Sequence, residues 1–255
     1  INITCNNRCC FVSTAKCDVT GTTGAVTTTS GSTLIATIAC ALGTPAFDTT
    51  PISDSKSNTW TQIDSDLSYS GASVLARVYK AVNITGGSGH TFTVDPAASS
   101  VGAIMVQEVT GAPASPTVTI STGRTDNASP YTSNNATLGA AGTIVGVIWT
   151  DAPSGTEVDT WGGSFASGDK TEELGDANNG ITGSLAAVDK GAGTYSTSVT
   201  VSGVTVGDSA NWIIAVETGV GPPSITTQPV GAAAVVGASA QYSIADTGAT
   251  SWQWQ

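Results

Sequence analysis

The stretch GSTLIATIAC, residues 31–40, decides the fold because a close copy of it, AGTIVGVI, recurs at residues 141–148. The two copies lie 110 residues apart (143 − 33 = 110) and share a Thr followed by aliphatic residues. Such residues favour β-strands, and a strand that is apolar on both faces is typical of the buried centre of a sheet. The stretch therefore predicts a central strand that the chain contains twice.

Three further blocks recur in the same order. The pairs are LARVYK (75–80) with LAAVDK (185–190), TFTV (91–94) with SVTV (198–201), and IMVQEVTG (104–111) with IIAVETG (213–219). Four matched blocks in one order predict an internal duplication of one β-rich unit. Strands at 33–40 and 143–150 should then occupy equivalent places, as should 74–82 and 184–192. A pseudo-two-fold axis or a tandem translation would relate the two units.

The predicted fold class is all-β: a duplicated jelly-roll-like β-sandwich followed by the start of an Ig-like β-sandwich. About a dozen short strands separated by Gly, Pro and Asn indicate this class. Within the repeats, NTW (58–60) would correspond to DTW (159–161). The predicted domains are a Cys-rich arm (1–10), repeat one (11–112), repeat two (113–219), a linker (220–224) and the start of a truncated Ig-like unit (225–255).

Composition narrows the functional classes. The chain has a net charge of −11, and only 11% of its residues are charged. Nucleic-acid binding needs a basic footprint, and docking on anionic lipid needs basic clusters, so neither partner is expected. No apolar run approaches the roughly 18 residues of a membrane span, so membrane insertion is not expected either.

Five cysteines raise the question of disulfides or a metal site. Four of them, Cys5, Cys9, Cys10 and Cys17, cluster near the N-terminus in a spacing that is not a standard zinc pattern. Two disulfides in an extracellular setting and free thiols without a site are the two interpretations. Cys40 alternates with aliphatic residues and is predicted to fill a core as a small hydrophobe.

The C-terminal segment resembles the opening of bacterial and phage Ig-like modules. The resemblance rests on I-T-x-Q-P at 225–229, VGASAQY at 236–242 and TGATSWQWQ at 247–255. It implies that Trp254 packs between two sheets. An Ig fold needs about 100 residues, so further chain is expected after Gln255.

The repeat region resembles a loosely defined group of β-sandwich proteins found in bacteriophage virions and in secreted bacterial surface proteins. The matching stretches are SDSKSNTWT (53–61), VYKAVNITGGSGHTFTV (78–94) and VQEVTGA (106–112). The resemblance implies a structural or binding role at a virion surface or outside the cell. Ig-like modules are commonly appended to phage capsid, tail and fibre proteins, which favours the same role by analogy.

Catalytic motifs are sparse. The single histidine, His90, precedes TFTV, and the chain has no G-x-S-x-G elbow and no phosphate loop. His90 is therefore interpreted as a turn or surface residue, whose change to Ala should alter stability by less than about 0.5 kcal/mol. Asp64 with Asp66, or Glu172 with Glu173, could form a glycosidase pair. Their polar context favours solvated loops, and no catalytic residue is predicted.

Two kinds of binding residue remain. Asp169, Glu172, Glu173 and Asp176 could offer oxygen ligands to Ca²⁺, the one cofactor considered, although no D-x-D-x-D-G loop accompanies them. Exposed rings could stack on sugars, while ordinary partial burial is the alternative for each. The predicted ligand-binding rings are Trp161, Tyr69 and Tyr131, whereas Trp60, Trp149 and Trp212 are expected in the core.

These patterns predict a non-enzymatic bacteriophage virion surface protein: a capsid decoration, head-fibre or tail-associated component. Its partners would be other virion proteins or copies of itself, together with host surface glycans. Two alternatives stay open. One is a secreted bacterial adhesin or surface-layer protein, and the other is the carbohydrate-binding accessory part of a larger glycoside hydrolase.

Overall fold

The computed structural model of the chain describes residues 10–15, 21–41, 46–69, 74–96, 101–125, 129–150, 155–174, 181–204, 207–219, 224–227 and 245–247. Within these ranges the chain forms antiparallel strands and one 3-10 turn, Ser167–Asp169, which confirms the predicted all-β sandwich class. The described residues include no helix long and apolar enough to cross a membrane.

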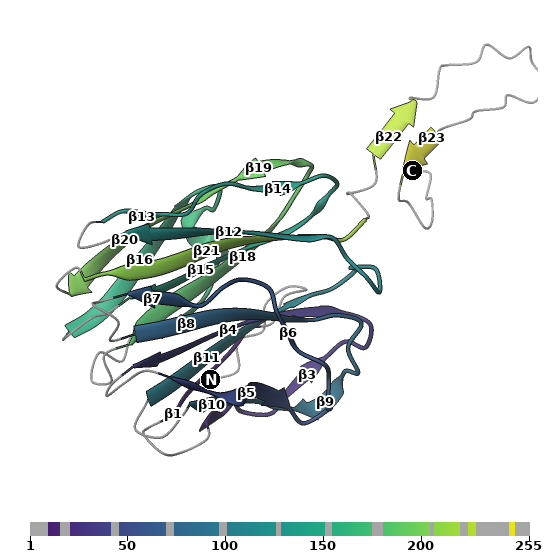
Figure 1. Ribbon diagram of the computed structural model, residues 1–255. Coiled ribbons are helices and arrows are strands. Elements are labelled where there is room, and N and C mark those ends of the chain that lie inside the picture. The colour runs from purple at the N-terminus through teal and green to yellow at the C-terminus, as the bar shows by residue number, and fades with distance from the viewer. Residues whose placement is uncertain are drawn as a thin grey trace, which may run out of the picture.

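The first half of the chain forms one large and one small sheet (Figure 1). Its strands are β1 (Cys10–Ala15), β2 (Gly21–Thr22), β3 (Val26–Thr28), β4 (Thr33–Ala41), β5 (Phe47–Asp54), β6 (Thr61–Gln62), β7 (Leu67–Tyr69), β8 (Val74–Ala81), β9 (Gly87–His90), β10 (Phe92–Pro96) and β11 (Val101–Val109). The large sheet has the order β1-β11-β4-β8-β6, with β7 also paired to β8, and the small sheet has the order β2-β10-β5. A separate pair, β3-β9, lies at the end of the sandwich.

The second half repeats this arrangement. Its strands are β12 (Val118–Thr125), β13 (Tyr131–Thr132), β14 (Ala136–Leu138), β15 (Gly142–Thr150), β16 (Gly155–Gly163), β17 (Lys170–Leu174), β18 (Thr182–Lys190), β19 (Gly193–Tyr195), β20 (Thr197–Val204) and β21 (Ser209–Glu217). The sheet orders are β12-β21-β15-β18-β17, β13-β20-β16 and β14-β19. Strands β4 and β15 thus hold the same central place, while the jelly-roll form of each half stays a prediction.

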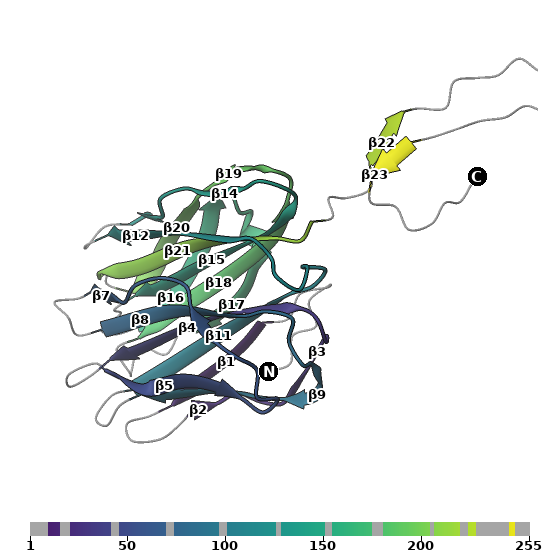
Figure 2. The same ribbon diagram turned by 45° about the vertical axis from the view of Figure 1, so that its right-hand side comes forward.

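The four sheets stack as layers, with the two large sheets in the middle (Figures 1 and 2). Every residue of β4 and β15 is buried, because one face of each strand meets its own small sheet and the other face meets the opposite half. In β4, Leu34 and Ile38 face the core of the first half, and Ile35 and Ala39 face the second half. This double burial explains why both stretches are apolar on both faces.

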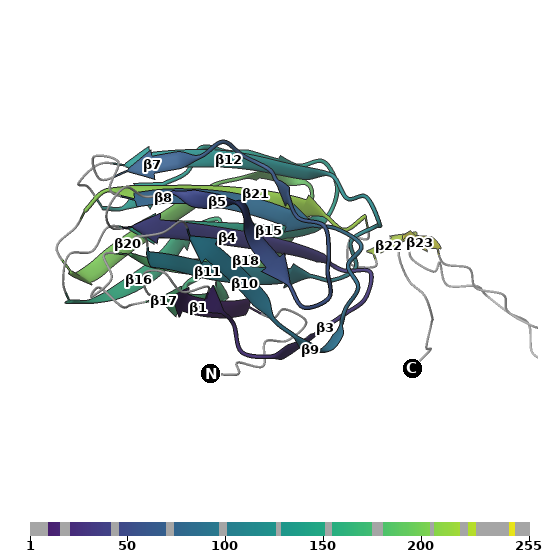
Figure 3. The same cartoon turned by 60° about the horizontal axis from the view of Figure 1, so that its bottom comes forward.

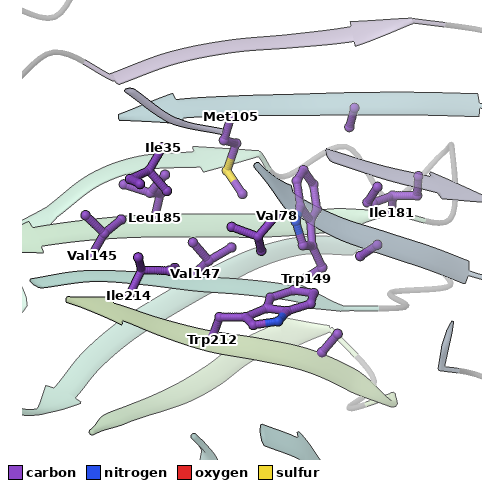
Figure 4. Close-up of a cluster of buried hydrophobic side chains, with 14 of the residues drawn as sticks. Ile35, Val78, Met105, Val145, Val147, Trp149, Ile181, Leu185, Trp212 and Ile214 are labelled. Carbon is purple, nitrogen blue, oxygen red and sulfur yellow. The ribbon is translucent and has the colours of Figure 1, made fainter. Parts of the chain in front are cut away.

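The core between the large sheets is shared by the two halves (Figure 4). Equivalent faces meet there, which a rotation between the halves produces and a tandem translation does not. The second half contributes Trp149 and Trp212, whereas the first half has Ala39 and Met105 at the corresponding places. The Trp149 indole donates a hydrogen bond of 2.7 Å to Thr37 Oγ1 across this core. Large rings from one half therefore fill space that small side chains of the other half leave.

Two glutamates perform the same task at the entry of the central strands. Glu108 Oε1 accepts hydrogen bonds from the Thr29 amide and the Ser32 hydroxyl, both 2.7 Å. Glu217 Oε1 accepts a 2.7 Å bond from the amide of Gly139, which is the counterpart of Thr29 (139 − 29 = 110). Each carboxylate thus holds the turn that leads into β4 or β15.

The structure corrects two details of the repeat alignment. Val78 pairs with Thr37, and Leu185 pairs with Val147, so the LARVYK and LAAVDK blocks are three residues out of register. Likewise, Trp161 pairs with Val199 as Asp54 pairs with Phe92, so DTW at 159–161 does not correspond to NTW at 58–60. Both errors arise because the links before these strands differ in length between the halves.

After the second half, β22 (Ser224–Thr227) pairs with β23 (Ala245–Thr247), apart from the sandwich layers (Figure 3). The other residues of the predicted Ig-like unit lie outside the described part of the chain. The Ig fold of that unit therefore stays a prediction.

Candidate functional site

A groove of about 610 Å³ opens on the first half, beside β5, the link after it, β6 and β8. Its floor contains aromatic and aliphatic side chains, its rim carries hydroxyl groups, and amide and charged groups stand at its sides. The lining residues are Thr49, Thr50, Pro51, Ile52, Ser53, Asp54, Ser57, Asn58, Thr59, Trp60, Gln62, Arg77 and Tyr79. The volume lies within the range of about 300–1,000 Å³ that is usual for small-ligand sites.

The Asp54 carboxylate organises the link that borders the groove. Its Oδ1 accepts hydrogen bonds from the amides of Lys56 (2.8 Å) and Asn58 (3.3 Å) and from the Asn58 side chain (3.2 Å). Its Oδ2 accepts a 2.7 Å bond from the Trp60 indole. The chain turns tightly enough that Ser57 takes a φ of 58°, which a non-glycine residue rarely adopts. One buried carboxylate thus fixes both the turn and the indole.

The same link is tied to the neighbouring turn at residues 85–91. The Thr85 amide donates to Asn58 Oδ1 (2.8 Å), and the Thr91 amide donates to Ser55 Oγ (2.9 Å). Lys56 Nζ donates to the Ser88 carbonyl at 2.9 Å. A link held at several points loses little conformational freedom when a ligand binds.

His90 is a buried residue, which corrects its interpretation as a turn or surface residue. The side chain is 0% exposed and packs on Phe92 with ring centroids 4.4 Å apart. His90 Nδ1 lies 2.7 Å from Thr28 Oγ1, and Nε2 lies 3.2 Å from Asp54 Oδ1 without hydrogen-bond geometry. A hydroxyl, an imidazole and a carboxylate also make up a nucleophilic triad. Here Thr28 is only 4% exposed, so the three groups lie inside the sandwich behind the groove.

Arg77 closes one side of the groove as half of an ion pair. Its Nε and Nη2 donate to the two carboxylate oxygens of Asp66, both at 2.7 Å, and its guanidinium lies 4.9 Å from the centre of the Phe47 ring. The hydrogen bond from Arg77 holds the pKa of Asp66 below its ordinary value. Asp64 Oδ2 accepts a 2.9 Å bond from the Trp212 indole of the other half. Asp64 and Asp66, one of the two carboxylate pairs considered for a glycosidase, thus make structural contacts.

The rings predicted to bind ligand are not exposed where the structure describes them. Trp161 is 3% exposed, donates to Ser184 Oγ at 3.1 Å and packs edge-on against Phe165. Tyr131 is fully buried, and its hydroxyl donates to the Gly207 carbonyl at 2.6 Å. Their burial corrects the exposure that the prediction assumed. Tyr69 belongs to β7, and its side chain lies outside the described part of the structure.

The proposed calcium ligands lie mostly outside the described residues. Asp169 Oδ2 accepts a 2.7 Å bond from the Ala166 amide and so closes the 3-10 turn. Glu172 and Glu173 belong to β17, but their side chains are not described, and neither is Asp176. In the described part of the chain, no three His, Cys, Asp or Glu residues are grouped to hold a metal ion. Calcium binding stays a prediction.

Cys40 is a core residue, as the sequence predicts. Its side chain is buried, and burial raises the pKa of the thiol to about 12. The thiol donates a 3.5 Å hydrogen bond to the Ala46 carbonyl. The side chains of the N-terminal cysteines at 5, 9, 10 and 17 lie outside the described part of the chain.

Sequence reasoning missed the groove because it assigned Trp60 to the core and left Asp54 unexplained. Trp60 packs against the core of the first half but is only partly buried, and Asp54 stands six residues before it. The stretch SDSKSNTW carried the signal, because an Asp followed by Ser and Asn residues favours a side-chain-capped turn.

No family model, no curated protein and no solved structure matches this chain.

Proposed function

We propose that the chain is a non-enzymatic surface protein of a bacteriophage virion, as a capsid decoration, head fibre or tail-associated component. The observation that carries the proposal is the shared core between the two halves. Residues from both large sheets form one continuous apolar cluster, and indole hydrogen bonds from Trp149 and Trp212 cross it. Such a body resists separation of its halves and suits a structural element of an assembled particle.

The surroundings of His90 support a non-enzymatic role. The only histidine of the chain is fully buried, so an extended polymer does not reach its imidazole in this arrangement. Its contacts with Thr28, Asp54 and Phe92 explain its presence structurally. The low charge content agrees with a surface that packs beside copies of itself or against a shell.

The test uses particles made by the genome that encodes this chain. Mass spectrometry of gradient-purified particles should detect the chain, and a variant ending at Gly221 should still co-sediment with them. Retention would place the particle-binding surface in the two halves. If the full chain never co-sediments, the virion assignment fails and the secreted-adhesin alternative takes its place.

A further inference from the structure

We propose that the groove beside Asp54 and Trp60 is a binding site for a neutral saccharide. This inference does not rest on the virion role proposed above. The groove lies in the first half and consists of a partly exposed indole, a ring of hydroxyl groups and ionic groups that are already paired.

The floor of the groove offers an aromatic surface for the apolar face of a sugar ring. Trp60 is partly exposed, and its ring meets Phe92 at 6.2 Å in an edge-on arrangement. Tyr79 lies beside it, 6% exposed, with its hydroxyl 3.4 Å from Gln62 Oε1. Rings with one wet side are common in binding sites because they bury much apolar area with few rotatable bonds.

The indole is held in place before any ligand arrives. Its N–H is bound to Asp54 Oδ2 at 2.7 Å, and Asp54 itself is fixed by the amides of Lys56 and Asn58. Behind Asp54, His90 and Thr28 fill the interior of the sandwich. A preorganised ring requires little ordering on binding, which favours a weakly interacting ligand such as a sugar.

The charges around the groove favour a neutral ligand. Asp54 accepts four hydrogen bonds, and Arg77 is bound through two N–H groups to Asp66. An acidic sugar would have to break the Arg77 pair, and a cation would have to displace donors from Asp54. The rim instead carries the hydroxyls of Thr49, Thr50, Ser53, Ser57 and Thr59, which can both donate to and accept from sugar hydroxyls.

A peptide strand is the rival occupant, because β5 is the edge strand of the small sheet. Strand addition to an edge needs a row of backbone N–H and C=O groups. Pro51 lies within β5 and lines the groove, and the pairing of β5 with β10 shifts register opposite it, between Val94 and Pro96, so the strand is irregular there. Proline on an edge strand is a known way to prevent such pairing. The irregular strand therefore disfavours a peptide, whereas a sugar does not need a regular row of backbone groups.

The test screens the purified full chain on an array of neutral and acidic glycans and then measures binding by saturation-transfer NMR and calorimetry. The probes are lactose, cellobiose, maltose and diacetylchitobiose, with sialyllactose as the acidic comparison. We expect at least one neutral saccharide to bind, and Trp60→Ala to weaken it about tenfold or more. Thr59→Trp should abolish binding by filling the groove from its exposed rim.

Thr160→Trp is the matched control, because it adds the same ring to an exposed strand position of the other half. It should leave the affinity unchanged. Circular dichroism and thermal melting show whether Trp60→Ala is folded, and Thr59→Trp tests the groove without touching the core. Absence of any bound neutral glycan on the array, binding of sialyllactose alone, or equal affinities for the Thr59 and Thr160 variants would overturn the proposal.

Discussion

Asp54 and Trp161 hold corresponding places in the two halves, yet they produce different interiors. In the first half, the carboxylate fixes a turn and an indole and leaves a groove beside them. In the second half, the indole ring of Trp161 is buried beside Gly146 of the central strand and packs against Phe165. The equivalent residue of the central strand is Ala36 in the first half and Gly146 in the second half. The same strand arrangement thus accommodates either a hydrogen-bonded carboxylate, Asp54, or a buried indole, Trp161, at this position.

The exchange at the central strand shows how closely the two interiors are fitted. A Cβ atom on Gly146 would lie 2.4 Å from the Trp161 ring, so a large ring requires a glycine there. In the first half the equivalent position is Ala36, and the residue that corresponds to Trp161 is Asp54, which has no ring. The small residue of the central strand thus accompanies the large ring in the second half.

Trp161→Ala should give the largest effect. The variant removes a buried ring and an indole hydrogen bond, so the free energy of unfolding should fall by about 3–5 kcal/mol. Urea denaturation measures it. The folded Trp161→Ala variant should bind saccharide as the wild type does. Asp54→Ala should weaken saccharide binding, even if it lowers the free energy of unfolding less than Trp161→Ala does. The comparison of the two halves would be wrong if both substitutions changed stability and binding equally.

His90→Ala should destabilise the protein by about 3 kcal/mol, because it leaves a cavity against Phe92 and removes the partner of the buried Thr28 hydroxyl. Thermal and urea unfolding check the value. A loss below about 0.5 kcal/mol would restore the surface interpretation that the sequence suggested.

Gly146→Ala should cost about 1–3 kcal/mol, because the new methyl group overlaps the Trp161 ring. The matched change in the first half is Ala36→Gly, which removes a methyl group and should cost about 0.5–1 kcal/mol. Both are measured by urea denaturation. If Gly146→Ala leaves the free energy of unfolding unchanged, the Trp161 ring is not tightly packed against the central strand. The proposed difference in packing between the two halves would then be wrong.

The smallest effect should come from the Asp66–Arg77 pair; in the second half, Ser184 holds the place of Arg77. The pKa of folded Asp66 lies below its ordinary value of 3.8, so the pair stabilises the fold above that pH. The contribution is lost as the pH falls through the lower, folded pKa. Because the Asp66 side chain is 43% exposed, it should amount to less than about 1 kcal/mol.

Thermal melts of the wild type and Asp66→Asn between pH 7 and pH 2 measure this contribution. The two proteins should differ at pH 7 and converge at the acid end. A difference that grows on acidification would contradict the assignment.

The sequence predicted the all-β class and the central strands well, because apolar runs such as TLIATIAC repeat and carry their own signal. Register was harder: β8 and β18 share an L-A-x-V-x-K pattern that is three residues out of step in the sheets. A shift of three residues exchanges the two faces of a strand, but most of β18 is buried on both faces, so its apolar residues do not reveal the shift.

Burial near glycines was also hard to predict. TWGGSF at 160–165 has the composition of a loop, but Trp161 belongs to β16, which ends at Gly163, and its ring packs inward over Gly146. The partner residue belongs to a strand of a different sheet. Conversely, Trp60 was assigned to the core because it lies in a strand-like run, while its indole is held by the carboxylate of the Asp54 turn. Contacts of this kind need the fold before they can be recognised.

The unequal sharing of the central core has a consequence for synthesis on the ribosome. The first half emerges earlier, and N-terminal units generally fold first. Until its partner is made, its interface face is open to solvent, and that face combines aliphatic side chains with the small residues Ala39, Ala76 and Ala103 and has no tryptophan among its buried members. The two tryptophans that complete the core, Trp149 and Trp212, arrive with the later half, when a folded surface already awaits them. The two large apolar rings of this core, Trp149 and Trp212, are therefore synthesised only after the surface that covers them.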